Sequence, residues 1–185
     1  MHLTRPLPLP LSIKQPNQAG FFLLEALVAI LIFSLGILGL VAMGSVAINA
    51  QNDAQYRTEA ANYASDIAGE ILLNIDRVTV TTGSGSASIT VPNPTTLATF
   101  QHFAGVPSPA GTCAFGGSAS TNPVVTAWAS KIISGTHPLP GATAANLQIS
   151  INQTATGFNQ ATIIVCWQAP SDRAMRQHKL ISYIN

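Results

Sequence analysis

The chain has 185 residues and a net charge of +1, and only 8% of its residues are charged. An average soluble domain carries about 25% charged residues. This composition gives no overall field that would recruit nucleic acid or an anionic membrane. Lys131 is the only charged residue between Arg77 and Asp172. The length suits one domain, with a surface typical of an extracytoplasmic protein or of packing against like subunits. A secreted domain without any assembly role would have the same composition.

An uncharged apolar run covers residues 26–48. As a helix it spans about 34 Å, enough to cross the hydrocarbon core of a membrane. The basic residues Arg5 and Lys14 precede the run, and no acidic residue comes before Glu25. By the positive-inside rule, we expect the N-terminus to stay in the cytoplasm and the rest of the chain to be exported.

The residues before this run do not resemble an ordinary secretory signal, whose cleavage site follows its apolar core. Residues 1–20 are rich in proline and end in ProAsnGlnAlaGly, and the apolar sequence begins abruptly at Phe21. Glu25 lies just inside it. A charge costs about 2.5 to 3.5 kcal/mol at the centre of a membrane helix and less near its end. Glu25 therefore indicates a function, the alternative being a side chain that only reaches the interface.

Residues 20–29, GlyPhePheLeuLeuGluAlaLeuValAla, resemble the processing site of type IV prepilins. The resemblance implies that a membrane aspartyl peptidase cleaves after Gly20 and methylates the new N-terminal amine of Phe21. It also implies that the apolar helix is retained for assembly, where Glu25 pairs with the N-terminal amine of a neighbouring subunit. Two features depart from the family pattern. Phe22 stands where a polar residue is commoner, and the leader, residues 1–20, is longer than many.

The helix is expected to continue beyond the membrane segment. One apolar stripe is formed by Tyr56, Ala60, Tyr63, Ile67, Ile71 and Ile75. Such spacing predicts a helix with one buried face, so we expect a single helix from Phe21 to about Arg77. Residues 21–48 form its transmembrane and assembly half, and residues 49–77 form its amphipathic half.

Two local features of this helix follow from residue type. Asp53 and Arg57 are spaced as an i,i+4 ion pair, worth a few tenths of a kcal/mol. Gly36, Gly39 and Gly44 each weaken helical order by about 1 kcal/mol relative to alanine. They allow close helix packing in a membrane, and the pilin resemblance implies that this part unwinds in the filament.

The remainder, residues 78–185, is predicted to be a globular head rich in β-structure. Strands at 78–82 and 88–91 flank a turn with Gly83 and Gly85, and residues 92–122 are predicted to be mainly loop. Asn122 and Pro123 are typical of a helix start, and Gly135 of its end. Its expected buried face is Val125, Trp128, Ala129 and Ile132. Alternating residues predict strands at 147–151, 161–167 and 180–184. The expected class is α+β, similar to the pilin fold.

Shorter matches point to one branch of the family, the PilV-like pilus modification proteins. They comprise residues 54–71 of the helix, TrpAla at 128–129, LeuProGly at 139–141 and ValCysTrpGln at 165–168. The resemblance is strong over residues 20–75 and patchy later.

Two cysteines, Cys113 and Cys166, lie in the predicted head. In an exported domain we expect them to form a disulfide, which would contribute about 4 kcal/mol on the chain-entropy model. Two reduced, buried thiols are the alternative. Two cysteines without histidines at ligand spacing do not make a zinc site.

The sequence offers no catalytic constellation, so we expect no enzyme activity, no metal and no cofactor. His2 lies in the leader, and His102, His137 and His178 are expected at the surface or in loops. There is no GlyXaaSerXaaGly elbow and no phosphate-binding glycine loop. Trp128 and Trp167 are expected in the core. A basic group is expected in a solvated loop before the last strand, the alternative being contact with DNA or an acidic partner. It comprises Arg173, Arg176, His178 and Lys179.

The resemblance implies a minor pilin that helps to initiate the pilus or its tip complex, and so serves twitching motility or adhesion. Its partners would be major and minor pilins, the prepilin peptidase, the assembly platform and a tip adhesin, but not nucleic acid. It would sit in the inner membrane with the head in the periplasm and then move into the surface pilus. The alternatives are a pseudopilin of type II secretion and a DNA-uptake or adhesion subunit.

Overall fold

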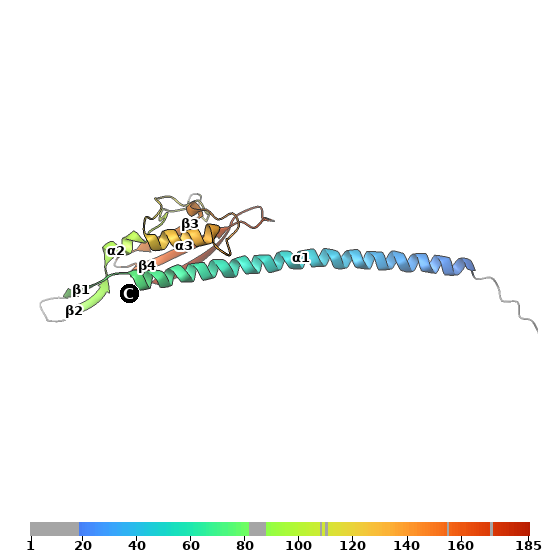
Figure 1. Ribbon diagram of the computed structural model, residues 1–185, viewed down its shortest axis with the longest axis horizontal. Coiled ribbons are helices and arrows are strands. Elements are labelled where there is room, and N and C mark those ends of the chain that lie inside the picture. Colours follow the sequence, from blue (N-terminus) through green and yellow to red (C-terminus); the bar gives the residue numbers. More distant parts are fainter. Residues whose placement is uncertain (1–18, 82–87, 108, 110, 155, 171) are drawn as a thin grey trace, which may run out of the picture. The chain divides into compact units, whose positions relative to one another are not determined.

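The computed structural model describes residues 19–81, 88–107, 109, 111–154, 156–170 and 172–185. Within these residues a long helix, α1 (Ala19–Asn74), precedes a hairpin, two shorter helices and a three-stranded sheet (Figure 1). The later elements are β1 (Arg77–Thr81), β2 (Ser88–Pro92), α2 (Pro94–Thr99), α3 (Pro123–Ser134), a 3-10 turn (Ala144–Asn146), β3 (Leu147–Asn152), β4 (Gln160–Trp167) and β5 (Arg176–Tyr183). The predicted α+β class is confirmed. Residues 1–18, with His2, and the predicted turn residues Gly83 and Gly85 lie outside the described residues.

The chain divides into two compact units, and the second is Ile48–Asn185. The first contains the apolar beginning of α1, which ends at Ala47 in this division. The second contains the rest of α1 together with the sheet, the hairpin, α2 and α3. We call this second unit the head.

Within the head, the predicted apolar stripe is the buried face of α1. Ala60, Ile67 and Ile71 are fully buried, as is the intervening Ala64. The helix ends at Asn74, three residues before the predicted Arg77. The Asn74 side-chain amide donates to the Glu70 carbonyl oxygen at 2.8 Å, which satisfies one of the carbonyl groups left open at a helix end.

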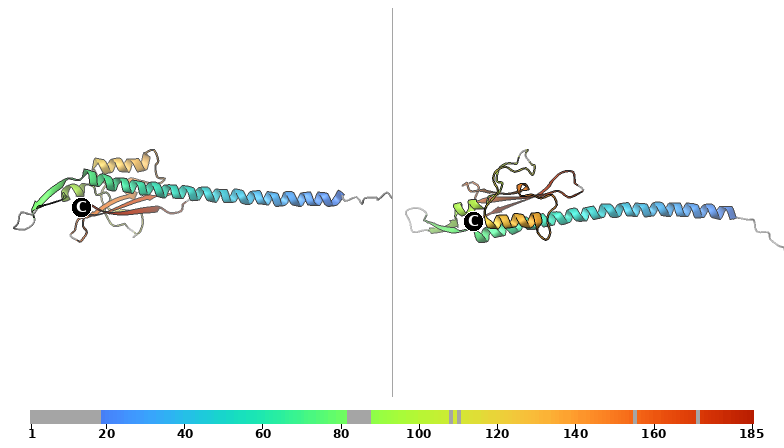
Figure 2. Two further views of the ribbon diagram at one scale, coloured as in Figure 1. Left: turned by 90° about the horizontal axis from the view of Figure 1, so that it is seen from below. Right: turned by 45° about the horizontal axis from the view of Figure 1, so that its top comes forward.

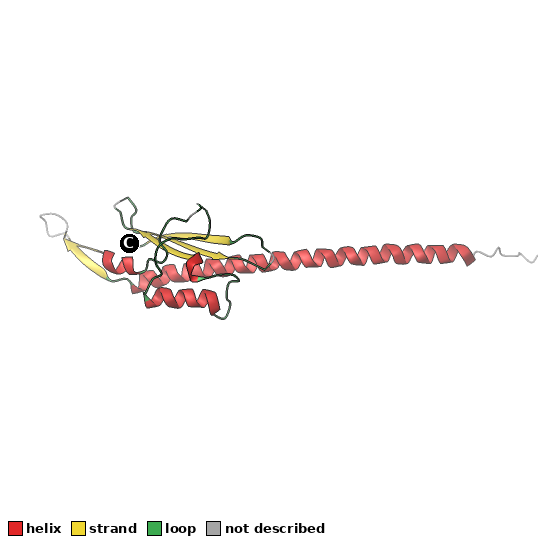
Figure 3. Ribbon diagram, turned by 90° about the horizontal axis from the view of Figure 1, so that it is seen from above, coloured by secondary structure: helices red, strands yellow, loops and turns green. Residues whose placement is uncertain are grey.

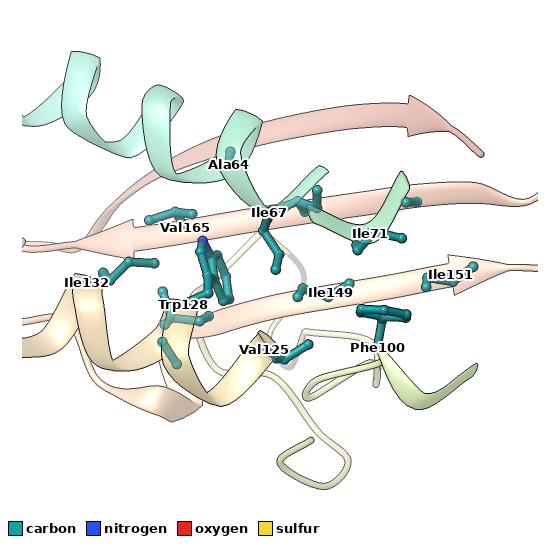
Figure 4. Packing of buried hydrophobic residues seen from close by; sticks show 14 of the residues in the cluster. Ala64, Ile67, Ile71, Phe100, Val125, Trp128, Ile132, Ile149, Ile151 and Val165 are labelled. Carbon is teal, nitrogen blue, oxygen red and sulfur yellow. The ribbon is translucent and has the colours of Figure 1, made fainter. Parts of the chain in front are cut away.

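The strands β3, β4 and β5 form an antiparallel sheet in that order. The register places Ile149 opposite Ile163, and Ile163 opposite Leu180. These residues lie on the inner face, which packs against α1 and α3 (Figures 2 and 3). Figure 4 shows this core, with residues Ile67, Ile71, Val125, Trp128 and Ile149. The head therefore has two layers, helices on one side and the sheet on the other.

The predicted helix after Asn122 is confirmed as α3. The Asn122 side-chain oxygen accepts from the Val124 N–H at 3.0 Å, and Pro123 occupies the first turn. The Trp128 indole N–H donates to the Tyr63 carbonyl oxygen of α1 at 2.8 Å. Trp128 thus satisfies its one polar atom within the core and fixes α3 against α1.

The prediction that residues 92–122 are mainly loop misses α2. Asn93 accepts a hydrogen bond from the Thr95 N–H at 3.0 Å and so caps this short helix. Leu97 and Phe100 then enter the core, at 0% and 1% exposure. Pro94 is the first helical residue, a position that needs no N–H donor.

The predicted hairpin is confirmed, with Val78 opposite Val91 and Val80 opposite Ile89. The prediction for the last strand is wrong at its start. β5 begins at Arg176, so His178 and Lys179 belong to the strand and not to a loop. An edge strand exposes every second side chain, and a polar, charged sequence is common there.

Candidate functional site

The junction of Gly20 and Phe21 lies in the first turn of α1, which begins at Ala19. Phe21 is 80% exposed, and the next side chains along the helix are exposed as well. The first N–H groups of a helix have no intrahelical acceptor. The backbone at this junction is therefore held less firmly than the interior of α1.

The beginning of α1 exposes apolar side chains in every direction around the helix. The larger ones are Phe22, Leu23, Leu24, Leu27, Val28, Ile30, Leu31, Ile32, Phe33, Leu35, Ile37, Leu38, Leu40, Val41, Met43, Val46 and Ile48. Soluble proteins rarely expose so large a continuous apolar surface. Within the described residues, α1 is the one helix long and apolar enough to cross a membrane. By its length and composition, this segment could therefore span a membrane.

Glu25 is the only charged residue of α1 before Asp53. It is exposed, and it follows Phe21 by four residues. Side chains four apart lie on the same face of a helix, about 6 Å apart along its axis. The carboxylate therefore lies one turn from the backbone nitrogen of Phe21, surrounded by apolar side chains.

Small residues interrupt the apolar segment at Gly36, Gly39 and Gly44. Apart from the adjacent residues and the backbone of the helix itself, no atom of the described residues lies within 4 Å of where a Cβ would stand at these three positions. The Ser34 hydroxyl donates to the Ile30 carbonyl oxygen at 2.7 Å and so needs no outside partner. Small residues of this kind let a second helix approach closely in a membrane.

In the head, Cys113 and Cys166 form the predicted disulfide. It attaches the loop 103–118 to the outer face of the sheet, opposite α1 and α3. Cys166 on β4 is fully buried, and with Cys113 it forms a second apolar cluster that includes Phe115 and Ile164. A disulfide over this separation contributes about 4 kcal/mol on the chain-entropy model. The loop thus covers one end of the outer face.

His102, expected at the surface or in a loop, lies outside the named helices and strands but is buried, at 2% exposure. Its Nε2–H donates to the Ala144 carbonyl oxygen and its Nδ1 accepts from the Ser120 N–H, both at 3.0 Å. Burial lowers the pKa of the His102 imidazole, while the bond to Ala144 acts in the opposite direction. Neighbouring Gln148 is also buried, and its amide donates to the carbonyl oxygens of Phe103 and Gly105 at 2.8 and 2.7 Å.

These two side chains hold loop 103–118 at its beginning. Phe103 has φ of 42°, a left-handed backbone conformation that is unfavourable for a residue with a Cβ. The contacts that hold the loop on both sides of Phe103 keep it in this conformation. Sequence reasoning missed both residues. For Gln148 the flanking Leu147 and Ile149 were the available signal, whereas His102 had none. The partners of both side chains are backbone atoms that only the fold brings near.

Arg176 is the residue of the predicted basic group that has definite partners. It forms two bonds with Asp172, at 2.6 and 2.9 Å, and an ion pair with Asp53 of α1 at 2.7 Å. Asp53 also forms the predicted pair with Arg57 at 3.1 Å. The hydrogen bond from Arg176 lowers the pKa of Asp172, and Asp172 raises the pKa of Arg176. Arg173 and Lys179 remain exposed.

The remaining histidines stay apart, with His137 exposed and His178 half-buried in β5. Within the part of the chain that the structure describes, no three His, Cys, Asp or Glu side chains gather as a metal site. Trp167, at 1% exposure, and Trp128 belong to the core as predicted. Neither a protein-family model, nor a curated protein, nor a solved structure matches this chain at a significant level.

Proposed function

We propose that this chain is a minor pilin of the type IV pilus, similar to the PilV-like pilus modification proteins. The observation that carries the proposal is the sequence of Gly20, Phe21 and Glu25 at the very beginning of a long apolar helix. A simple membrane anchor needs neither a glycine junction before its apolar run nor a carboxylate inside it. Both are needed if the helix is cut there and then assembled.

Processing would take place between Gly20 and Phe21. A peptidase must extend the backbone that it cuts, and the first turn of α1 can be extended with fewer lost hydrogen bonds than the helix interior. Glycine lets an active site approach the backbone closely. The enzyme would then methylate the amine of Phe21 and leave the apolar helix in place.

Assembly would use Glu25 as the partner of that amine. A neighbouring helix displaced by about one turn, 6 Å along the axis, brings its Phe21 amine level with this carboxylate. In an apolar filament core the attraction between the two charges is strong, and either charge alone is costly. The pair would therefore select the axial position of each incoming subunit. Gly36, Gly39 and Gly44 would allow the helices to pack closely there.

The head is proposed to lie in the periplasm before assembly and on the pilus afterwards. Its disulfide suits an oxidising compartment. The chain would meet major and minor pilins, the prepilin peptidase, the assembly platform and a tip adhesin. It would assist initiation of the pilus, and through it twitching motility or adhesion.

Deleting the gene and then imaging pili and measuring secreted protein tests this function. We expect fewer pili, or pili with altered twitching, and unchanged secretion. Wild-type protein should restore the pili, whereas the Glu25→Ala variant should restore them poorly. Normal pili with a loss of secretion would instead identify a pseudopilin of type II secretion. Normal pili and normal secretion would contradict both.

A further inference from the structure

A groove of about 350 Å³ lies in the head between α1 and α3. The residues that line it include Asp66, Ile67, Glu70, Val124, Trp128 and Lys131. Its accessible apolar surface comes from Pro123, Val124 and Ala127 of α3, which lie over the buried side chains of Ile67 and Trp128. One rim, on α1, carries two carboxylates. The other rim, on α3, carries the ammonium group of Lys131.

The carboxylates belong to an acidic stripe on α1, which we define as Glu59, Asp66 and Glu70. At 100° per residue these three positions lie within about 40° of one another around the helix. Tyr63 lies between them. Its pKa is raised by burial and, next, by the negative charges of Glu59 and Asp66, as expected for groups on one face. The stripe and Lys131 together carry a net charge of −2, from three negative groups and one positive group.

Most other charged groups of the head have a partner, and within the stripe Glu70 accepts a hydrogen bond from the Asn74 side-chain amide at 3.0 Å. Asp53, Arg57, Asp172 and Arg176 form one ion-pair network. Asp76 accepts from the Thr96 hydroxyl, and Arg77 donates to the Asn185 carbonyl oxygen. Within the described residues, the acidic stripe forms no ion pair, and the same holds for Lys131, Arg173 and Lys179.

A surface that is complementary in charge to the groove lies on the opposite side of the head. The outer face of β5, which we define as Gln177, Lys179, Ile181 and Tyr183, is exposed at all four positions. Ile181 and Tyr183 are 47% and 54% exposed. An ammonium group beside an aliphatic and an aromatic side chain complements carboxylates beside an apolar groove.

We infer that the groove between α1 and α3, with its acidic stripe, binds the outer face of β5 of a second copy of this chain. Lys179 meets the stripe, and Ile181 and Tyr183 cover the apolar surface of the groove. The inference goes beyond the proposed function, because it requires only that two copies share one membrane.

The heights of the two surfaces along the head agree with this contact. Arg176 pairs with Asp53, so β5 begins beside that turn of α1, and the bond from Arg77 to Asn185 places its end near the end of α1. Lys179 lies three residues beyond Arg176, about 10 Å along the strand. Glu59 lies six residues beyond Asp53, about 9 Å along the helix. Two copies in the same orientation therefore present Lys179 and Glu59 at the same height.

The groove faces away from the sheet, and the outer face of β5 faces away from the helices. A contact between different faces of two identical chains is heterologous, and it leaves one free surface of each kind. Further copies can add at both ends, so the contact builds rows of heads and not a closed pair.

The test uses the full chain in lipid vesicles that contain isotopically labelled and unlabelled copies. A carbodiimide joins an amine directly to a carboxylate in contact, and mass spectrometry identifies the joined peptides. We expect links between Lys179 and the acidic stripe that combine the two isotopes. Their yield should fall at least several-fold in Glu59→Lys, and also on raising the salt from about 0.05 M to 0.5 M. Asp76→Lys, with the same charge change outside the stripe, should leave the yield unchanged as the control.

Mixing two variants gives the decisive result. Lys179→Glu copies alone have no amine at position 179 to be joined, and Glu59→Lys copies alone should form few such links, because Lys179 then faces a like charge. Together they should form one that joins the two substituted positions. The inference is overturned if mixed-isotope links between Lys179 and the stripe are absent, or if the stripe is linked only to a different protein. Either outcome leaves the pilin proposal standing, because processing at Gly20 and filament incorporation are measured separately.

Discussion

Arg176 on β5 and Asp53 on α1 form an ion pair at 2.7 Å, at the first charged position after the apolar segment. The same guanidinium group holds Asp172 through two hydrogen bonds. One arginine therefore joins the beginning of β5, the loop before it and the helix. The connection fixes the height of β5 along α1.

Arg176→Met should lower the urea concentration at the unfolding midpoint, because it leaves two carboxylates without their shared partner. The urea midpoint of Arg176→Lys should lie between those of the wild type and Arg176→Met. Lysine keeps the charge but lacks the planar guanidinium group that binds a carboxylate through two bonds. Chemical unfolding of the three proteins at low and high salt checks this. Equal midpoints at low salt would mean that the ion pair is a surface contact of no consequence.

Stability should depend on pH through His102. Burial lowers its pKa in the folded state, whereas the unfolded value is about 6.5. As the pH falls below about 6.5, the unfolded chain takes up the proton first, and the free energy of unfolding decreases until the folded pKa is passed. Protonation would also place a hydrogen on Nδ1, which now accepts from Ser120.

We therefore expect a lower urea midpoint at pH 5 than at pH 7.5, with the difference reduced in His102→Gln. His137 and His178 remain in that variant and provide the internal control. An equal difference in wild type and variant would assign the pH dependence to other groups.

Two glycines of the loop 103–118 give a matched pair of substitutions. A Cβ on Gly105 would stand 2.7 Å from the backbone of Gly116, whereas a Cβ on Gly116 would have its nearest neighbour at 3.9 Å. Gly105→Ala should destabilise the protein by about 1 to 3 kcal/mol, as expected for overpacking. Gly116→Ala should lower the free energy of unfolding much less. Urea unfolding compares them, and similar losses would show that the two loop segments separate without cost.

Glu25→Ala should separate membrane insertion from assembly. Removing a charge makes the segment more apolar, so insertion and cleavage after Gly20 should be retained. Incorporation into filaments should fall, since the neighbour's amine would be buried without its partner at a cost of about 3 to 5 kcal/mol if fully buried. The measurement is the ratio of this protein in sheared pili to that in membranes, at matched expression. An unchanged ratio would mean that Glu25 only reaches the interface.

Local signals in the sequence were enough for many elements of the head. The stripe through Ala60, Ile67 and Ile71 predicted its buried helix face, and Asn122 with Gly135 predicted the limits of α3. Alternation predicted the cores of β3 and β4. In these segments the spacing of apolar residues fits either a helix or a strand but not both, and tertiary contacts do not change the secondary structure that forms.

The errors occurred where distant contacts decide the structure. α2 is too short to show a period, and it depends on Leu97 and Phe100 reaching the core. His102 has no signal of burial in its own segment, because its partners are backbone atoms of Ala144 and Ser120. Arg176 looked like a loop residue, since the carboxylate of Asp53 that accepts it is far away in the sequence.

The most direct test of the pilin proposal is the intact mass of the protein purified from membranes of cells that contain a prepilin peptidase. The expected mass is that of a chain beginning at Phe21 with one added methyl group. A Gly20→Leu variant should keep its leader, because the larger side chain hinders approach to the backbone, and it serves as the control. A mature chain beginning beyond residue 40 would mean an ordinary signal peptide and would contradict the proposal.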